Sequence, residues 1–448
     1  MLTPSRLVAA ALAAWMSCVA LALAFGAPLT GDECAYGLLA RGSGVDWLYR
    51  SRGMVELARV GLAFGGSDVA MRVASALASC GIIVAIAAVG RRLGPWTGAL
   101  GACVIAGTHT FVMRGPELLG DLPATACLLG AIAIAIDELE RAGGASYRLV
   151  AAAPLCATAF YVRYGSAPVI AIIALAAVVL WWRSIARRPA PVLVTAAVLV
   201  ALLVPFAIAS QRATGSILGI LRMSEDAAGR SYIGQGLRSY FTRSPWHTYG
   251  VLLTPLAVVG LAGAVLRRDR IGLFLASVAV GQLVALGVVS HASTRFIFVA
   301  LCLLVLLGLD TLVRARLVLR HATWARRIGV FALAAAWLGM VIAIVPIERH
   351  IARGLYDLVG SAQAIRIDAA GAPCTVVARA TPQLMWYSGC SAVRLSVDPS
   401  APIALPAGRR GYAAYTPKRP LVPVLVARLT GTTARRLWPW HAWALDAR

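Results

Sequence analysis

The sequence predicts a polytopic α-helical membrane protein that ends in a small α/β domain. Of its 448 residues, 60% are hydrophobic and only 14% are charged, whereas about a quarter of the residues in a soluble globular chain are charged. The apolar residues are gathered into blocks close to the roughly 20 residues that a helix needs to cross a bilayer. Short arginine clusters separate several of these blocks.

Each apolar block is expected to form one transmembrane helix, about eleven in all. Their approximate bounds are 7–27, 69–90, 97–113, 118–136, 148–162, 165–182, 191–210, 249–266, 271–290, 296–313 and 328–346. The first block also resembles a signal peptide, because "ALA" at 22–24 is typical of a cleavage site. We expect it to remain as a helix, because the topology of the other helices requires it.

The distribution of arginine predicts the orientation of these helices. With the N-terminus in the cytoplasm, the cytoplasmic loops hold the arginine clusters at 91–92, 183–188, 267–270 and 314–327. The loops between them hold mainly single basic residues, which is the positive-inside pattern. The chain after the last helix then lies outside the cytoplasm. We therefore expect a transmembrane module at 1–346 and an extracytoplasmic α/β domain at 347–448.

The tail contains the run "CTVVARATPQLMWYSGCSAVRL", which reads as a strand, a short helix and a second strand. Cys374 and Cys390 bracket this polar segment. Outside the cytoplasm a disulfide between them is plausible, although the sequence alone does not supply the geometry that a disulfide requires.

The net charge of +23 does not indicate a nucleic-acid partner. The basic residues lie between apolar blocks rather than on one soluble face, and all of them except Lys418 are arginines. Usage rich in arginine and alanine is typical of a GC-rich bacterial genome. The expected location is therefore the bacterial cytoplasmic (inner) membrane.

This topology places outside a longer loop at 211–248 and four shorter stretches that carry isolated polar residues. The four stretches read "GDECAYG" (31–37), "RGPELLGD" (114–121), "VRYGS" (162–166) and "SHASTRF" (290–296). Arginine binds phosphate through planar paired donors, and a carboxylate can accept the proton of an attacking hydroxyl. Charged groups at membrane depth are costly, which favours a functional role. The pattern suits a site that joins a lipid phosphate to a neutral nucleophile.

These motifs, in this order, resemble the GT-C superfamily of glycosyltransferases. The resemblance rests on Asp32-Glu33 after the first helix, "SDVAMRVASAL" at 67–77, the loop at 114–121, Arg163 before Tyr164, and Arg295 before Phe296. It is greatest for the branch of dolichyl-phosphate-mannose protein mannosyltransferases and lipid A aminoarabinose transferases. Where relatives have a His-Pro-Pro patch, this chain reads "YRSRGMVELARV" at 49–60, which leaves the substrate open.

The resemblance implies a GT-C fold and transfer of a sugar, a hexose or a pentose, from a polyprenyl-phosphate donor, with inversion. Asp32 corresponds to the base that deprotonates an acceptor hydroxyl, or that orients it where a metal assists, and Glu33 supports it. Asp121, with Glu117 nearby, corresponds to a second catalytic carboxylate, which orients the acceptor or the donor sugar. Arg163 and Arg295 correspond to residues that hold the donor phosphate. The acceptor is a lipid, a glycan or a protein.

Further polar residues are candidates for supporting roles. His291 could donate to the phosphate or bind a divalent metal, although no His/Cys/Asp cluster has the spacing of a zinc site. Arg114 and Glu117 lie near Asp121 in the same loop. Glu56 is expected to pair with Arg59 on one face of a short helix.

Structural roles compete with these catalytic ones. Asp32 and Glu33 in "TGDE" resemble the first turn of a capped helix, and Asp121 also lies near a helix start. Arg163 and Arg295 could be interface arginines with extended side chains. Two other functions also remain open: a transporter or lipid flippase, and a non-catalytic relative that acts as an assembly partner.

Overall fold

The protein is described here by a computed structural model. The structure describes residues 3–43, 47–141, 146–227, 232–242, 253–290, 292–318, 338, 342, 355–378, 381–394, 409–414, 434–437 and 442–445. The chain divides into two compact units. The first unit comprises Met1–Ala20, Trp47–Met54 and Ser75–Ile342, and the second comprises Leu21–Asp46, Val55–Ala74 and Ala343–Arg448.

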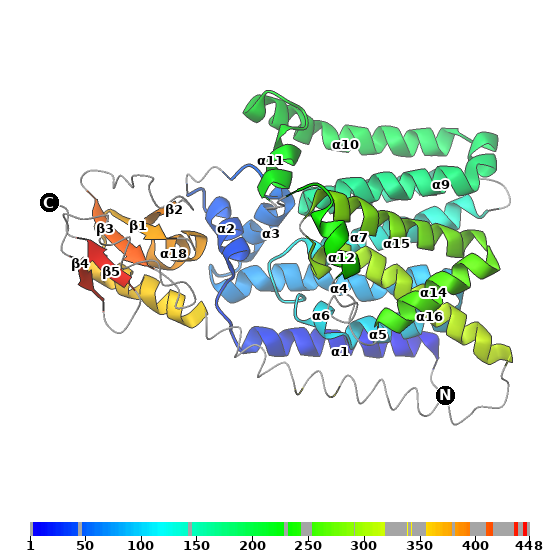
Figure 1. The fold of residues 1–448 in the computed structure, drawn as a ribbon, viewed down its shortest axis with the longest axis horizontal. Coiled ribbons are helices and arrows are strands. Elements are labelled where there is room, and N and C mark those ends of the chain that lie inside the picture. The colour runs from blue at the N-terminus through cyan, green and yellow to red at the C-terminus, as the bar shows by residue number, and fades with distance from the viewer. Residues whose placement is uncertain are drawn as a thin grey trace. The chain divides into compact units, whose positions relative to one another are not determined.

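The first unit is a bundle of long helices that lie roughly side by side (Figure 1). In chain order, the helices that lie wholly or partly in it are α1 (Pro4–Ala24), α3 (Arg52–Ala63), α4 (Asp68–Leu93), α5 (Pro95–Ala106), α6 (His109–Val112), α7 (Asp121–Leu139), η1 (Tyr147–Ala151), α8 (Ala152–Val162), η2 (Tyr164–Ser166), α9 (Ala167–Arg187), α10 (Ala190–Thr214), α11 (Gly219–Ala227), α12 (Gln235–Thr242), α14 (Leu253–Arg267), α15 (Arg270–Val289), η3 (Thr294–Ile297) and α16 (Phe298–Val318).

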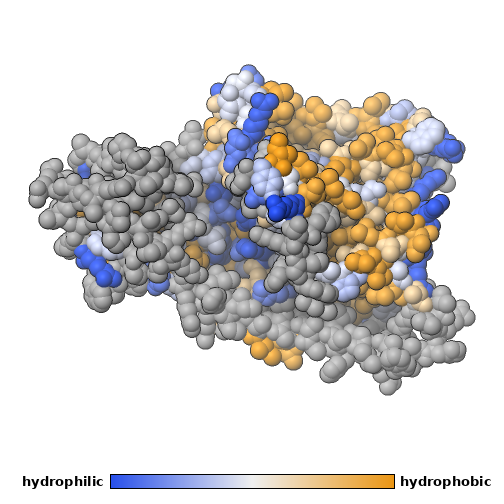
Figure 2. Space-filling model, viewed as in Figure 1, coloured by the Kyte–Doolittle hydropathy of each residue, from blue (hydrophilic) through white to orange (hydrophobic). Residues whose placement is uncertain are grey.

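The predicted multi-pass membrane architecture is confirmed. Within the described residues, seven helices are long and apolar enough to cross a membrane, and three further apolar helices are shorter. Every predicted segment up to residue 313 coincides with one or more described helices. The segment predicted at 328–346 lies outside the described residues except for Leu338 and Ile342. Hydrophobic side chains cover much of the visible surface of the bundle (Figure 2), as expected for helices that face lipid.

Two predicted segments differ from the helices observed. The segment at 97–113 is divided, because Thr108 takes an extended backbone conformation (φ −97°, ψ 116°) between α5 and α6. The segment predicted to begin at residue 118 begins instead at Asp121, after a run of bends. The polar loop is therefore longer than its hydropathy suggests, and Asp121 occupies the first turn of α7.

Small residues let the helices of the bundle approach closely. A Cβ atom on Gly260 of α14 would lie 2.5 Å from the backbone nitrogen of Gly308 on α16. Gly98 of α5 and Gly90 of α4 abut in the same way, with 2.5 Å between a Cβ built on Gly90 and the Cα of Gly98. Close backbone contact through small residues is the usual means by which membrane helices pack.

The second unit contains helix α2 (Gly31–Ala40) and a five-stranded sheet in the order β2-β1-β3-β5-β4. The elements of the tail are a helix over 355–369, β1 (Cys374–Ala378), α18 (Thr381–Ser388), β2 (Ser391–Arg394), β3 (Arg410–Ala414), β4 (Ala434–Arg436) and β5 (Ala442–Leu445). Strand β1 is parallel to β2 and β3, and β5 is antiparallel to β3 and β4. The predicted strand, helix and strand are confirmed. A domain boundary between residues 346 and 347 stays a prediction.

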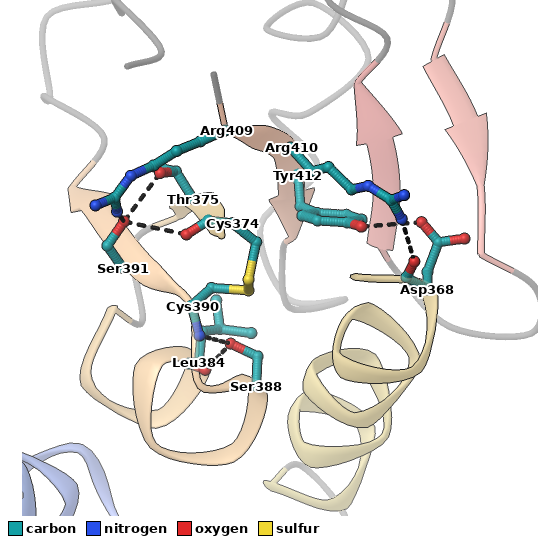
Figure 3. Close-up of a disulfide and its surroundings, with 10 residues drawn as sticks. All are labelled: Asp368, Cys374, Thr375, Leu384, Ser388, Cys390, Ser391, Arg409, Arg410 and Tyr412. Carbon is teal, nitrogen blue, oxygen red and sulfur yellow. Dashed lines mark hydrogen bonds between the residues drawn. A yellow bond between two sulfur atoms is a disulfide. The ribbon is translucent and has the colours of Figure 1, made fainter. Parts of the chain in front are cut away.

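The disulfide between Cys374 and Cys390 is present and connects the start of β1 to the turn before β2 (Figure 3). The sheet is further tied to the helix at 355–369 through Asp368. Its carboxylate accepts a hydrogen bond from the Tyr412 hydroxyl at 3.0 Å, and its backbone carbonyl accepts one from Arg410 at 2.7 Å. The tail thus has a core of its own, centred on buried residues of β1, β3 and β5.

Removing the disulfide is expected to destabilise the tail. The two cysteines are 16 residues apart, and closing a loop of about 15 residues contributes about 3 kcal/mol through the unfolded chain. The double substitution Cys374→Ser and Cys390→Ser should therefore make the tail of the purified protein sensitive to protease at a lower temperature than in the wild type. Unchanged protease sensitivity of the tail would contradict this prediction.

Candidate functional site

A polar pocket in the first unit is lined by side chains from three separate parts of the chain. Asp121 and Thr125 come from the start of α7, Arg163 and Ser166 from the turn between α8 and α9, and Gln282, Arg295 and Phe296 from α15 and η3. The structure thus brings together three of the residues that the sequence selected, namely Asp121, Arg163 and Arg295.

Arg163 reaches the pocket because α8 ends directly before it. Its backbone is extended (φ −153°, ψ 108°), so the chain leaves the helix at this residue. Its guanidinium forms an ion pair with the carboxylate of Asp121, which is only 5% exposed. A side chain on Gly120 would overlap the carbonyl oxygen of Val162, so a glycine is needed for α7 to begin this close to Arg163.

Arg163 and Arg295 lie near the same aromatic ring. The guanidinium carbon of Arg163 is 4.7 Å from the centre of the Phe296 ring, and that of Arg295 is 5.5 Å from it. Gln282 holds this turn in place, because its amide nitrogen donates to the carbonyl of Phe296 at 3.0 Å and its oxygen accepts from Ala300 at 2.6 Å. Two cations and one carboxylate leave the pocket with a net positive charge, which suits an anion.

The segment 49–53 is attached to the turn that carries Arg163. Tyr164 donates its backbone N–H to the Ser51 hydroxyl at 3.4 Å, and the Tyr164 hydroxyl accepts from the backbone N–H of Arg52 at 3.3 Å. A Cβ on Gly53 would lie 2.8 Å from the backbone carbonyl carbon of Tyr161. Arg50 and Arg52 are therefore held on a chain segment adjoining this turn. The sequence analysis did not select Arg50 and Arg52 as candidates, although both lie in the basic run "YRSRG" at 49–53.

The carboxylates after the first helix lie in the second unit, in the first turn of α2. Thr30 is the N-cap, and Glu33 accepts the backbone N–H of Thr30 at 2.8 Å in a capping box. The helix-capping role that was the alternative for "TGDE" is therefore correct for Glu33. Asp32 is half-buried in the same turn.

Glu33 is also one partner of a buried ion pair. Its side chain is fully buried, and its two oxygens each accept a hydrogen bond from Arg72 at 2.7 Å. Arg72 additionally donates to the backbone carbonyls of Ala27 at 2.5 Å and Pro28 at 3.1 Å. Both oxygens of Glu33 are therefore engaged by the guanidinium of Arg72.

Comparison with known proteins identifies the fold. A family model described as dolichyl-phosphate-mannose-protein mannosyltransferase matches residues 57–208. The crystal structure of ArnT, an aminoarabinose transferase, from Cupriavidus metallidurans in its apo state superposes with a TM-score of 0.67 at 16% identity, over 98% of this chain and 97% of that one. The chain has the GT-C fold. The resemblance predicted from its motifs is confirmed.

Two further structures match the same GT-C fold. ArnT from Cupriavidus metallidurans bound to undecaprenyl phosphate has a TM-score of 0.68 at 16% identity and the same coverage of 98% and 97%. The oligosaccharyltransferase of Archaeoglobus fulgidus, tethered to an acceptor peptide, has a TM-score of 0.57 at 12% identity, over 84% of this chain and 63% of that one. No curated protein matches the sequence of this chain.

The remaining candidate residues lie apart from the pocket lining or outside the described residues. Arg114 and Glu117 pair with each other at 2.7 Å in their loop. Glu56 pairs with Arg59 at 2.5 Å on α3, as predicted. His291 lies outside the described residues. Among the residues that the structure does describe, no three His, Cys, Asp or Glu side chains come together as a metal site.

Proposed function

We propose that this protein transfers a sugar from a polyprenyl-phosphate donor to an acceptor hydroxyl on the outer face of a bacterial cytoplasmic membrane. The observation that carries the proposal is the pocket in which Arg163 and Arg295 lie near Phe296, with Asp121 paired to Arg163. Its support from outside the chain is the fold that it shares with ArnT, which was crystallised with undecaprenyl phosphate. The arginine distribution supports the outward orientation.

In the proposed reaction Arg163 and Arg295 bind the donor phosphate. Asp32 accepts the proton of the acceptor hydroxyl, whose oxygen attacks the anomeric carbon from the face opposite the phosphate. The bond between this carbon and the phosphate oxygen breaks, and the electron pair leaves with polyprenyl phosphate. The arginines stabilise the charge that develops on the leaving group, so no strong general acid is required. The configuration at the anomeric carbon inverts.

The other carboxylates have supporting roles in this proposal. Asp121 orients Arg163 and restricts its movement, as an ion pair at 5% exposure is suited to do. Glu33 holds the turn on which Asp32 lies. Arg50 and Arg52, which adjoin the turn of Arg163 through Tyr164, are further candidates for binding an anionic part of the donor or the acceptor. Turnover of individual donors in a panel of polyprenyl-phosphate sugars distinguishes a hexose from a pentose.

The proposal is tested in reconstituted membranes with a panel of polyprenyl-phosphate sugars. Wild-type protein should release polyprenyl phosphate from at least one donor. Arg295→Gln and Arg163→Gln should each lower kcat/KM by about 10–100-fold, since a hydrogen bond to a charged group contributes about 1.5–3 kcal/mol. The matched control is Arg183→Gln. Arg183 is exposed on α9, so this substitution should leave the rate unchanged.

Two outcomes would overturn the proposal. Wild-type rates in both pocket variants would show that the pocket does not hold the donor phosphate. A folded wild-type protein that turns over no donor, but moves a polyprenyl-phosphate lipid between leaflets, would instead establish a flippase.

A further inference from the structure

The tail helix α18 packs against α2, the helix whose first turn carries Asp32. A Cβ on Gly37 of α2 would lie 2.7 Å from the indole ring of Trp386, and a Cβ on Gly31 would lie 3.1 Å from the side chain of Gln383. The guanidinium of Arg41 lies 3.6 Å from the centre of the Trp386 ring. Glycine at position 37 thus allows direct contact between α2 and a bulky residue of α18.

Tyr387 of α18 holds the chain that leads into α2. Its hydroxyl accepts the backbone N–H of Leu29 at 2.8 Å and donates to a carboxylate oxygen of Asp68 at 2.5 Å. The other oxygen of Asp68 accepts the indole N–H of Trp386 at 3.0 Å. Two consecutive residues of the tail helix therefore bind the same carboxylate, and one of them also binds a peptide group three residues before Asp32.

Together with Arg72, this arrangement binds three consecutive residues at the entry to α2. Arg72 binds the carbonyls of Ala27 and Pro28, and Tyr387 binds the N–H of Leu29. Burial of Tyr387, reinforced by its hydrogen bond to Asp68, raises the pKa of the phenol well above its usual value. The hydroxyl therefore stays protonated at physiological pH and can act as donor and acceptor at once.

We infer that Tyr387 and Asp68 are positioning residues, which set the place of the Asp32 carboxylate through the backbone of residues 27–31. This inference rests on the proposed function, in which Asp32 is the base. Proton transfer requires the base to lie within about 2.6–3.2 Å of the hydroxyl, and a displacement of about 1 Å costs on the order of 100-fold in rate. Helix α18 of the tail thereby helps to position the proposed base.

The test compares Tyr387→Phe with Tyr412→Phe in the full-length reconstituted protein. Both substitutions remove one tyrosine hydroxyl from a hydrogen bond with an aspartate of the second unit, but Tyr412 binds Asp368 from strand β3. Tyr387→Phe should lower kcat by about 10-fold or more with KM for the lipid donor within about twofold. Tyr412→Phe should leave both constants unchanged. A lower unfolding temperature in Tyr387→Phe with unchanged kcat would overturn the inference.

A second measurement asks whether Tyr387 acts through Asp32. In protein that already carries Asp32→Asn, adding Tyr387→Phe should change the residual rate by less than about twofold, because residues that act as a unit are not additive. Asp68→Asn should show the same dependence, which covers the case in which Tyr387→Phe fails to fold. Losses that multiply would show a general structural role and overturn the inference.

The proposed function can fail separately from the positioning role. A wild-type protein that releases no polyprenyl phosphate would overturn both. Full activity in Asp32→Asn would remove the base assignment and with it any carboxylate to be positioned. Loss of activity in Asp32→Asn, combined with equal kcat in Tyr387→Phe and Tyr412→Phe, would overturn the positioning role alone.

Discussion

Replacing Asp32 with Asn is expected to lower the rate of sugar transfer by about 10²–10⁴-fold, the range in which general-base catalysis contributes. Asparagine has nearly the same size as aspartate but cannot accept the proton of the acceptor hydroxyl. The helix should remain intact, because its capping box is formed by Thr30 and Glu33. The measurement is release of polyprenyl phosphate from reconstituted protein, at equal protein abundance.

A carboxylate elsewhere in the second unit provides the matched control for Asp32→Asn. Asp357 is exposed on the helix over 355–369, so Asp357→Asn makes the same chemical change on a different helix and should retain the wild-type rate. Full transfer by Asp32→Asn would show that Asp32 is not the base. Equal losses in both variants would point to an effect of net charge rather than to catalysis.

Replacing Arg72 with Met is expected to destabilise the second unit by about 3–5 kcal/mol, because it leaves Glu33 charged, fully buried and without its cationic partner. The backbone carbonyls of Ala27 and Pro28 also lose their donor. The effect is measured by thermal unfolding in detergent, with protease sensitivity of the tail as the readout.

Two comparisons separate burial of charge from simple loss of an arginine. Arg59→Met breaks an ion pair whose side chains are 53% and 61% exposed, and should cost at most about 1 kcal/mol. Adding Glu33→Gln to Arg72→Met removes the stranded charge while a glutamine can still complete the capping box, so part of the stability should return. An Arg72→Met protein as stable as the Arg59→Met protein would contradict the prediction.

The membrane helices could be predicted from the sequence because hydrophobic length is a local property. A block of about 20 apolar residues satisfies its backbone polar groups only as a helix when it lies in lipid, whatever its neighbours are. For the same reason α18 and the strands that flank it could be recognised in the single run "CTVVARATPQLMWYSGCSAVRL". The predicted helix bounds were wrong at residues 97–113 and at 118–120. There the chain leaves the helical conformation within an apolar or mixed stretch.

The fold class, the GT-C resemblance and the individual candidates Asp32, Asp121, Arg163 and Arg295 could all be read from the sequence. Which side chains meet could not, because it depends on how distant helices pack. Arg72 was visible in "SDVAMRVASAL", yet its partner Glu33 is 39 residues away, and Tyr387 is 319 residues from Asp68. Such pairs are set by the approach of distant helices, and no periodicity along the chain records that approach. For the same reason Glu33, selected as a supporting carboxylate, proved to be the buried partner of an arginine.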